Sequence, residues 1–238
     1  MRLAVTQPNF FPWLGYFDLL DSIDKIIFLD NVALSTRSFM VRNRMKNKQD
    51  KPFWMSEAIR HKSQNKLICE HFVVEDRKWL LDIMNMIDVH YREAACYGDL
   101  QNLLNRMLSI ESSQLPQFNA SIILLISDYL GITFDYDFAS RIETSLVDSP
   151  QDRILDICVK QDTREYYAFK NGIEEGLYSG DVFSAKGIRL MKQMYNHPEY
   201  KQVGSSFLSH LSILDLIANA GRDAADIIRK GRQWQTVN

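Results

Sequence analysis

The chain has 238 residues, of which 46% are hydrophobic and 24% charged, as is typical of a globular protein with a core of its own. Its net charge of −2, without a basic stripe, disfavours a nucleic-acid-binding protein, and we expect no DNA partner. The three cysteines, at positions 69, 96 and 158, lack zinc-ligand spacing and are expected to be reduced thiols.

No membrane segment is expected. The longest apolar run, residues 122–126, is far shorter than the roughly 20 residues that cross a bilayer. The N-terminus has a strand pattern and lacks the charged and apolar regions of a signal peptide. We therefore expect a cytoplasmic protein without a membrane span.

The N-terminal residues predict a strand, a helix and a second strand, in that order. An apolar strand at residues 3–5 leads into an aromatic turn, and the second strand, residues 26–29, ends on Asp30. This β-α-β alternation predicts an α/β fold with a mostly parallel, Rossmann-like sheet and flanking helices. Because ligands bind beyond the carboxyl ends of such strands, the polar and aromatic residues there are site candidates.

The rest of the chain alternates without a clear linker. Further strands are expected at residues 52–56, 69–74, 132–136, 165–169 and 188–195. Helices are expected from residue 75 and over 98–131, with a break at Pro116. A further helix is expected to start at 149–152 and continue through Cys158, and others are expected at 207–220 and 224–230, with Asn171-Gly172 as a turn. We expect one domain over residues 1–238, with a helical insertion that forms a subdomain at about 77–130.

The first site candidates lie in the aromatic turn. They are Gln7, Pro8, Trp13, Gly15 and Tyr16. Trp13 and Tyr16 offer flat surfaces suited to a base or a sugar, and glycine allows a backbone or ligand to approach closely. The alternative, about equally weighted, is a rigid aromatic corner that only packs.

The segment that follows the second strand supplies charged candidates. Asp30 is suited to a ribose hydroxyl, a metal or an amine, although an aspartate that merely caps the loop is the commoner case. Arg42, Asn43 and Arg44 form a basic cluster whose guanidinium groups are suited to a phosphate. The alternative is an ordinary solvated charge run.

A late loop supplies a candidate base. His197 has a pKa suited to proton transfer at neutral pH, and Tyr195, Tyr200 and Gln202 are hydrogen-bonding neighbours. A histidine that only caps a turn is the alternative. His210 and Asp215 are five positions apart, so a helix would not stack them on one face.

Several blocks in this order resemble the WbqC-like family of bacterial proteins over nearly the full length. The strongest blocks are QPNFFPWLGYFDLLDSIDKIIFLDNV, from residue 7, and RNRMK, from residue 42. The weaker blocks are NGxxxGLY from residue 171, Phe183 with Gly187-Ile188, YxHPxYxQ from residue 195 and LSILDL from residue 211.

The resemblance implies a role in decorating nucleotide-linked amino sugars for surface polysaccharides such as O-antigen. It implies a transferase that attaches an amino acid, such as glycine, or an acyl group to the amine of a 4-amino-4,6-dideoxyhexose. The donor is left open among ATP plus an amino acid, an aminoacyl-tRNA, coenzyme A and a carrier-protein thioester. A homodimer is also left open.

In that reaction His197 would take the amine proton, while Asp30 or Asp215 would orient the amine. Arg42 and Arg44 would grip the pyrophosphate, and Trp13 or Tyr16 would stack on the base. Two other classes stay open. One is a nucleotide-sugar binding module without catalysis, and the other is a hydrolase or lyase with a metal on Asp24, Asp30 and His197, although no tight metal motif is present.

Overall fold

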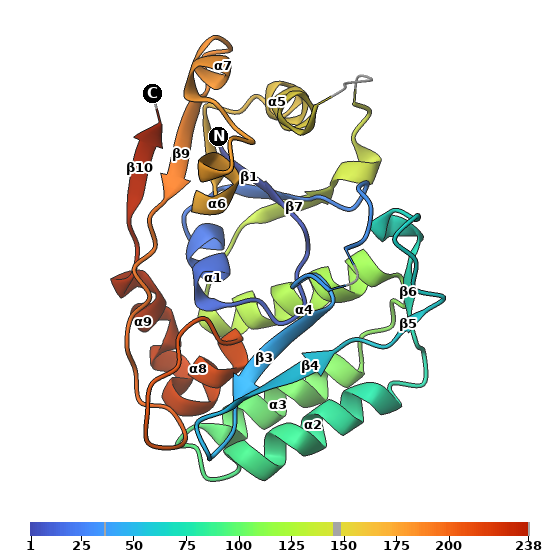
Figure 1. Ribbon diagram of the computed structural model, residues 1–238, viewed down its shortest axis with the longest axis vertical. Helices are drawn as coiled ribbons and strands as arrows, with labels where there is room; N and C mark the ends of the chain where they lie inside the picture. Colours follow the sequence, from blue (N-terminus) through green and yellow to red (C-terminus); the bar gives the residue numbers. More distant parts are fainter. Residues whose placement is uncertain (36, 145–148, 238) are drawn as a thin grey trace.

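The computed structural model describes residues 1–35, 37–144 and 149–237 and is built around a mostly parallel, Rossmann-like sheet (Figure 1). The strand order is β10-β9-β8-β1-β2-β7, and only the pair of β10 with β9 is antiparallel. The strands are β1 (Arg2–Thr6), β2 (Lys25–Phe28), β7 (Asp135–Phe138), β8 (Glu165–Ala168), β9 (Arg189–Gln193) and β10 (Trp234–Val237).

Strand β1 lies at the point where the strand order reverses. The chain passes from β1 through α1 (Leu14–Leu20) to β2 on one side, whereas β8 and then β9 are added on the other side. The loops that leave the carboxyl ends of β1 and β8 therefore turn to opposite faces of the sheet. A crevice opens between such loops, which is where α/β proteins hold their ligands.

Both faces of the sheet are buried, as the apolar strand sequences require. Leu3, Val5 and Ile27 point to one face and pack with residues of α5 (Pro150–Lys160) and α7 (Gly180–Ser184). Ala4 and Ile26 point to the other face, in the larger core, which includes residues of α1, α4 (Leu115–Leu130), α8 (Ile213–Ala220) and α9 (Ala224–Lys230).

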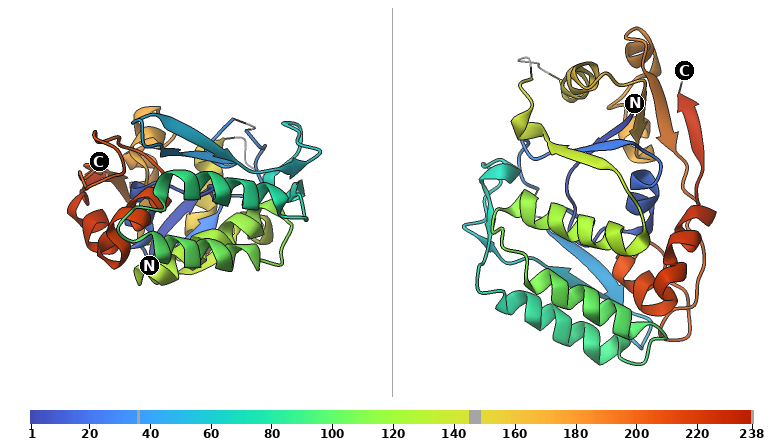
Figure 2. Two further views of the ribbon diagram at one scale, coloured as in Figure 1. Left: turned by 90° about the horizontal axis from the view of Figure 1, so that it is seen from below. Right: turned by 180° about the vertical axis from the view of Figure 1, so that it is seen from behind.

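A helical insertion separates β2 from β7 in the chain. It contains α2 (Lys78–Tyr91), α3 (Tyr97–Leu108) and α4, which lie beside one another away from the β9–β10 edge (Figure 2). Two short antiparallel pairs precede it: β3 (Arg42–Lys46) with β4 (Pro52–Ser56), and β5 (Ile59–Arg60) with β6 (Phe72–Val73). Short helix α6 (Lys170–Glu174) follows β8, and three 3₁₀ turns lie at Ile68–Glu70, Ala139–Arg141 and Gly221–Asp223.

The predicted α/β class is confirmed, with corrections to several elements. The strand expected at 69–74 is a 3₁₀ turn followed by two-residue β6, because the backbone there bonds to the loops around it. The helical region expected at 98–131 is divided, as predicted, but the break lies at residues 109–114, between α3 and α4. Pro116 itself stands in the first turn of α4, where its missing N–H costs nothing. The turn expected at Asn171-Gly172 is helix α6, and the helix expected from residue 207 begins at Ile213, capped by Ser212.

Within the described residues, no helix is both long enough and apolar enough to cross a membrane. The longest apolar run lies in α4, which packs in the larger core and buries Ile122, Ile123 and Ile126. The subdomain expected at about 77–130 stays a prediction.

Candidate functional site

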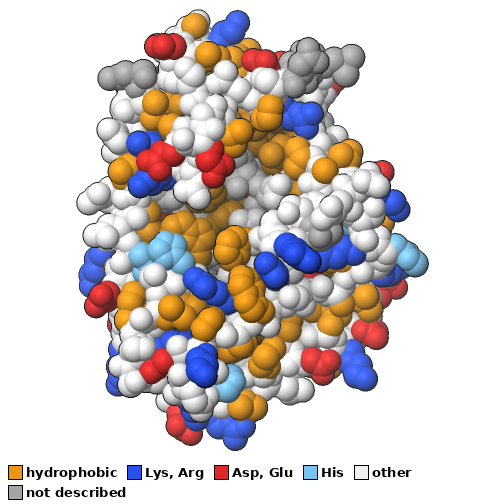
Figure 3. Space-filling model, viewed as in Figure 1, with side chains coloured by type: hydrophobic (Ala, Val, Ile, Leu, Met, Phe, Trp, Pro, Cys, Tyr) orange, Lys and Arg blue, Asp and Glu red, His pale blue; other side chains and the backbone are white. Residues whose placement is uncertain are grey.

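A cavity of about 660 Å³ opens at the carboxyl ends of β1, β8 and β9, at the reversal of the strand order. Its lining includes Gln7, Asn9 and Trp13 after β1, Lys170 and Asn171 after β8, and Tyr195 after β9. Phe39, Asn43 and His210 come from other loops and from β3. Figure 3 shows a hollow in the upper half of this face, with hydrophobic side chains around it and Lys and Arg side chains below and to the right.

The turn after β1 is held in a strained shape by Asn43. Phe11 is buried and has a φ of 45°, in the left-handed region that bulky residues avoid. The Asn43 side-chain amide donates to the carbonyl oxygens of Phe10 at 3.3 Å and Phe11 at 2.8 Å. Asn43 itself is buried and is placed by β3, so the basic hairpin fixes the shape of the cavity wall.

Gly15 is required by Trp13. A Cβ at position 15 would lie 2.2 Å from the Trp13 ring, so the indole packs directly on the backbone of α1. The close approach that glycine allows is therefore made by an aromatic wall of the cavity.

We expect Gly15→Ala to destabilise the fold by about 1–3 kcal/mol, because the added methyl group must displace the Trp13 ring. Gly98→Ala is the matched control. It also replaces a helical glycine, but nothing lies within 4 Å of the new Cβ, so it should be neutral or stabilise by up to about 1 kcal/mol. Urea unfolding measures both changes, and equal effects would contradict the packing described for Trp13.

Asn119 ties the same turn to helix α4. Its buried amide donates to the carbonyl oxygens of Pro8 and Met40, both at 3.0 Å, and to Glu57 Oε2 at 3.4 Å. Glu57 is also buried, and its Oε1 has no partner among the described residues. Burial raises the pKa of Glu57 well above its usual range. The hydrogen bond from Asn119 and the charges of Lys62 and Arg77 act in the opposite direction, but their effect is smaller.

This raised pKa predicts that Glu57→Gln stabilises the protein at neutral pH. The folded state binds the Glu57 proton more tightly than the unfolded state does. The free energy of unfolding of the wild type is therefore highest below the ordinary pKa of 4.5 and falls as the pH rises from there to the raised pKa. The gain of the variant should therefore be small at pH 4 and larger at pH 7. Thermal unfolding at both pH values tests it, with exposed Glu93→Gln as the control; a variant that is less stable than wild type at pH 7 would contradict the prediction.

Trp13 carries a group of rings on the cavity side. The His210 and His197 rings are stacked on it, with centroids 5.1 and 6.4 Å away, and Tyr195 meets it edge-on at 5.6 Å. Backbone bonds bring these segments together, since Ser212 N–H donates to the Arg44 carbonyl and Ile213 N–H to the Pro12 carbonyl. The structure thus joins the turn, the β3 cluster and the late loop, which the sequence predicted to share a site.

His197 is half-buried next to Trp13 and His210 and does not line the cavity. Its Nδ1 lies 3.0 Å from the Pro198 carbonyl oxygen, an acceptor, so Nδ1 carries the proton and Nε2 presents a lone pair. That Nε2 is buried and has no partner among the described residues. Burial, with a smaller contribution from the charge of His210, lowers the pKa of His197 to about 4.

His210 lines the cavity, although the sequence had not marked it as a site residue. It has a φ of 57°, and its Nδ1 is 2.9 Å from Ser209 Oγ. Its ring centroid is 5.1 Å from that of His197. Partial burial and the charge of Arg44 lower the pKa of His210, so both imidazoles favour the neutral, proton-accepting form.

The other candidates of the late segment form a buried network. Asp215 is fully buried and accepts hydrogen bonds from Tyr91 at 2.5 Å and Tyr200 at 2.7 Å. Burial raises its pKa. Gln202 is also buried and bonds to the backbone of Leu208 at both ends of its amide. These residues shape the loop that carries His197 and His210, and they do not line the cavity.

Several candidates from the N-terminal segments are likewise enclosed. Asp30 is fully buried and accepts from the Ser140 N–H at 2.8 Å and the Ser140 hydroxyl at 2.7 Å. Pro8 and Tyr16 are buried, and the Tyr16 hydroxyl donates to the Gln7 carbonyl oxygen. Tyr16 therefore presents no free ring face to a base, whereas Gln7 lines the cavity.

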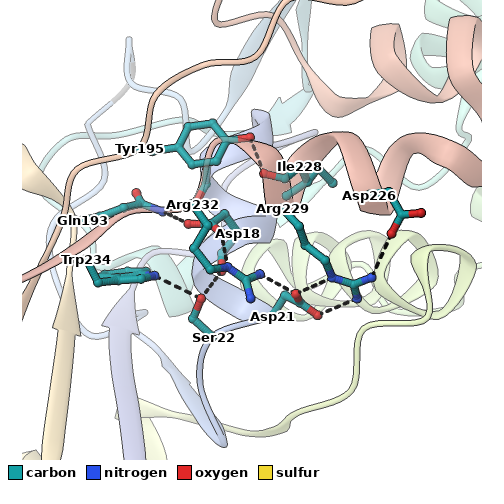
Figure 4. Close-up of polar contacts among 11 residues, drawn as sticks. Asp18, Asp21, Ser22, Gln193, Tyr195, Asp226, Ile228, Arg229, Arg232 and Trp234 are labelled. Carbon is teal, nitrogen blue, oxygen red and sulfur yellow. Dashed lines mark hydrogen bonds and ion pairs between the residues drawn. The ribbon is translucent and has the colours of Figure 1, made fainter.

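A charged network supports the floor of the cavity (Figure 4). Gln193, at the end of β9, donates to the Gly15 carbonyl oxygen at 2.9 Å and to Asp18 Oδ2 at 2.8 Å. Asp18 is fully buried, and its other oxygen accepts from Arg232 Nε at 2.7 Å. Arg232 also contacts Asp21, which pairs with Arg229 on the surface. The network joins β9, α1 and the segment before β10.

A second cavity, of about 850 Å³, lies at the opposite, amino ends of the parallel strands. Its charged groups are largely paired, with Arg2 on Asp24 and Arg189 on Glu165, each at 2.6 Å. It holds none of the residues that the sequence singled out for substrate binding. Asp24, Asp30 and His197 are thus in separate environments, and no three His, Cys, Asp or Glu side chains among the described residues are placed to hold a metal ion.

The fold and the site define an α/β protein with a Rossmann-like sheet and a ligand-sized cavity at its topological switch point. The sequence pattern of the WbqC-like protein family matches residues 7–227, and the chain belongs to that family. The chain is also 27% identical over 235 residues to the uncharacterized protein Rv1507c of Mycobacterium tuberculosis (strain ATCC 25618 / H37Rv), covering 98% of this chain and 99% of that protein. No solved structure matches the chain significantly.

Proposed function

We propose that the protein transfers an amino acid, such as glycine, or an acyl group to the amine of a nucleotide-linked 4-amino-4,6-dideoxyhexose. The observation that carries the proposal is the cavity at the switch point, where the amide side chains of Gln7 and Asn9 and the imidazole of His210 share the lining with the Trp13 ring. Such a lining suits a sugar, because its amides bond to hydroxyl groups while rings pack on the apolar sugar face. Family membership supports the same reading.

The transfer needs a base and a stabilised oxyanion. The neutral amine attacks the donor carbonyl carbon, the C–N bond forms, the amine proton leaves to a base, and the donor's leaving group departs with the carbonyl bond restored. In our proposal the base is the pair of His197 and His210, in which His210 lines the cavity and His197, 5.1 Å away between ring centroids, presents an Nε2 without a described partner. In the same proposal the amides of Gln7 and Asn9, which line the cavity, donate to the oxyanion.

The remaining candidates act around that centre. Arg42 and Arg44 bind the pyrophosphate, and Trp13 packs on the sugar. Asp30 and Asp215 are enclosed, and we assign them positioning roles: Asp30 fixes the loop after β2, and Asp215 fixes the segment with the histidines. The donor is ATP plus an amino acid, an aminoacyl-tRNA, coenzyme A or a carrier-protein thioester.

Mass spectrometry of the sugar nucleotide tests the proposal. The purified protein is incubated with dTDP-4-amino-4,6-dideoxyglucose and, in parallel, with glycine plus ATP, glycyl-tRNA, acetyl-coenzyme A or a carrier-protein thioester. A mass gain on the sugar in any arm is the expected result and identifies the donor. No gain in any arm, including one with a carrier-protein thioester, contradicts the proposal, while cleavage of the sugar nucleotide that EDTA abolishes would favour a metal-dependent hydrolase or lyase.

A second candidate is a nucleotide-sugar binding module without catalysis. It is favoured by the burial of His197, which is half-buried and does not line the cavity. In that case the sugar nucleotide would protect the protein thermally, His197→Ala would leave its affinity unchanged, and no product would form.

A further inference from the structure

The β3–β4 hairpin presents one face to the core and the other outward. Asn43 and Met55 are paired across the two strands and buried. Because side chains alternate along a strand, Arg42 and Arg44 share the opposite face, where Arg44 is paired with Trp54. The hairpin therefore carries an arginine pair and an indole on a single outward face.

Two exposed aromatic rings lie together on this face, at the rim of the cavity. Trp54 is 44% exposed and Phe39 is 52% exposed, and their ring centroids are 6.4 Å apart. The Arg42 guanidinium carbon lies over the Trp54 ring, 4.5 Å from its centroid, in a cation–π contact. Phe39 also lines the cavity, so the two features are continuous. We call Phe39, Arg42, Arg44 and Trp54 the rim platform.

The arginines of the rim platform have no carboxylate partner in the part of the chain that the structure describes. Among the described residues no carboxylate forms an ion pair with Arg42 or Arg44, whereas Arg2, Arg229 and Arg232 are each paired. Nε of Arg44 is buried and lacks a described partner. Arg42 Nε donates to the Arg37 carbonyl oxygen at 3.0 Å, which leaves its positive charge without a described anion. Exposed rings next to such guanidinium groups fit a ligand that joins a flat base to phosphate.

From this arrangement we infer that the rim platform binds the nucleoside diphosphate end of the substrate. Trp54 and Phe39 stack on the base, Arg42 and Arg44 bind the phosphates, and the sugar extends past Phe39 into the cavity. The choice of a nucleotide as the occupant rests on the proposed function. With only two arginines on the face and a net charge of −2 for the chain, a mononucleotide is favoured over an RNA strand.

Calorimetric titration with dTDP and with thymidine tests this assignment. Trp54→Ala should raise the Kd of dTDP at least about 5-fold, while Trp54→Phe should restore most of the affinity. Arg44→Gln should weaken dTDP but not thymidine. Phe72→Ala is the matched control, because Phe72 is also exposed at 38%, also lies under an arginine (Arg60, 5.2 Å), and is outside the cavity; it should change neither Kd. Thermal unfolding of each variant confirms that it is folded.

Unchanged dTDP affinity in folded Trp54→Ala would overturn the inference, as would Trp54-dependent binding of a single-stranded RNA with no binding of dTDP. The two proposals fail separately. If Trp54→Ala forms product with an unchanged KM for the sugar nucleotide, the rim platform is rejected and the transferase proposal stands. If dTDP binding depends on Trp54 but no donor gives product, the transferase proposal is rejected and the rim platform stands.

Discussion

Arg232→Met should destabilise the protein by about 3 kcal/mol or more at pH 7. Asp18 is fully buried, and the guanidinium of Arg232 is the cation that contacts it, at 2.7 Å. Without that partner a buried carboxylate stays uncompensated, and breaking a buried ion pair in this way typically costs about 3–5 kcal/mol. Equilibrium unfolding in urea measures the loss.

Arg229→Met is the matched control. Arg229 also pairs with Asp21, but it is 43% exposed, and such pairs contribute about 1 kcal/mol or less. The difference should also shrink at low pH. Burial raises the pKa of Asp18, and removal of Arg232 raises it further, so the carboxyl takes up a proton as the pH falls and the buried charge disappears. Equal losses in the two variants would contradict the role of the Asp18–Arg232 pair under the cavity floor.

The second large effect is expected on acyl transfer. His197→Ala and His210→Ala should each lower kcat/KM by about 100-fold or more, because a positioned base typically contributes that much. The low pKa of His197, about 4, adds a pH signature: protonation of this residue should reduce activity only below about pH 5. Initial rates of the mass-spectrometric assay between pH 4 and 8 measure both effects.

His61→Ala is the control for the histidine variants. Like His210, His61 is exposed and has a positive φ, but it does not line the cavity. It should retain wild-type activity. If His197→Ala and His210→Ala are both as active as His61→Ala, neither imidazole is the base, and the chemistry assigned to this pair is wrong.

The N-terminal half of the site could be predicted because its signals are local. Apolar strands at residues 3–5 and 26–29 alternate with a helix, and strand ends in such a fold meet at one edge. Gln7, Trp13 and Asn43 line one cavity, and their role in a site stays a prediction. For Gly15, the sequence indicated that some group comes close to the backbone. The structure shows that this group is the Trp13 ring.

The features that sequence missed depend on tertiary contacts. The sequence of strand β3 resembles a solvated run of charges, because one of its faces carries arginines. Its pairing with β4 is what shows that these residues form a strand. His210 was expected inside a helix, but the helix starts at Ile213, and the loop before it turns the imidazole to the cavity. Asn171 follows a strand whose parallel pairing to β1 no local pattern encodes.

Burial explains why other candidates lie away from the cavity. Asp30, Asp215 and Tyr16 have residue types and positions that suit a site, but each side chain is enclosed and bonded within the protein. A sequence indicates that such a residue lies just beyond the end of a strand, as Asp30 does, or in the first turn of a helix, as Asp215 does. It does not indicate whether the side chain turns inward, because that depends on distant partners such as Ser140 and Tyr91.

A crystal structure with dTDP-4-amino-4,6-dideoxyglucose tests the central claim, that the cavity at the switch point of the sheet is the substrate site. We predict that the amino sugar lies between Gln7, Asn9 and His210, with the phosphates toward Arg42 and Arg44. Density for the ligand in the cavity at the amino ends of the strands, between Arg2 and Arg189, would contradict the claim.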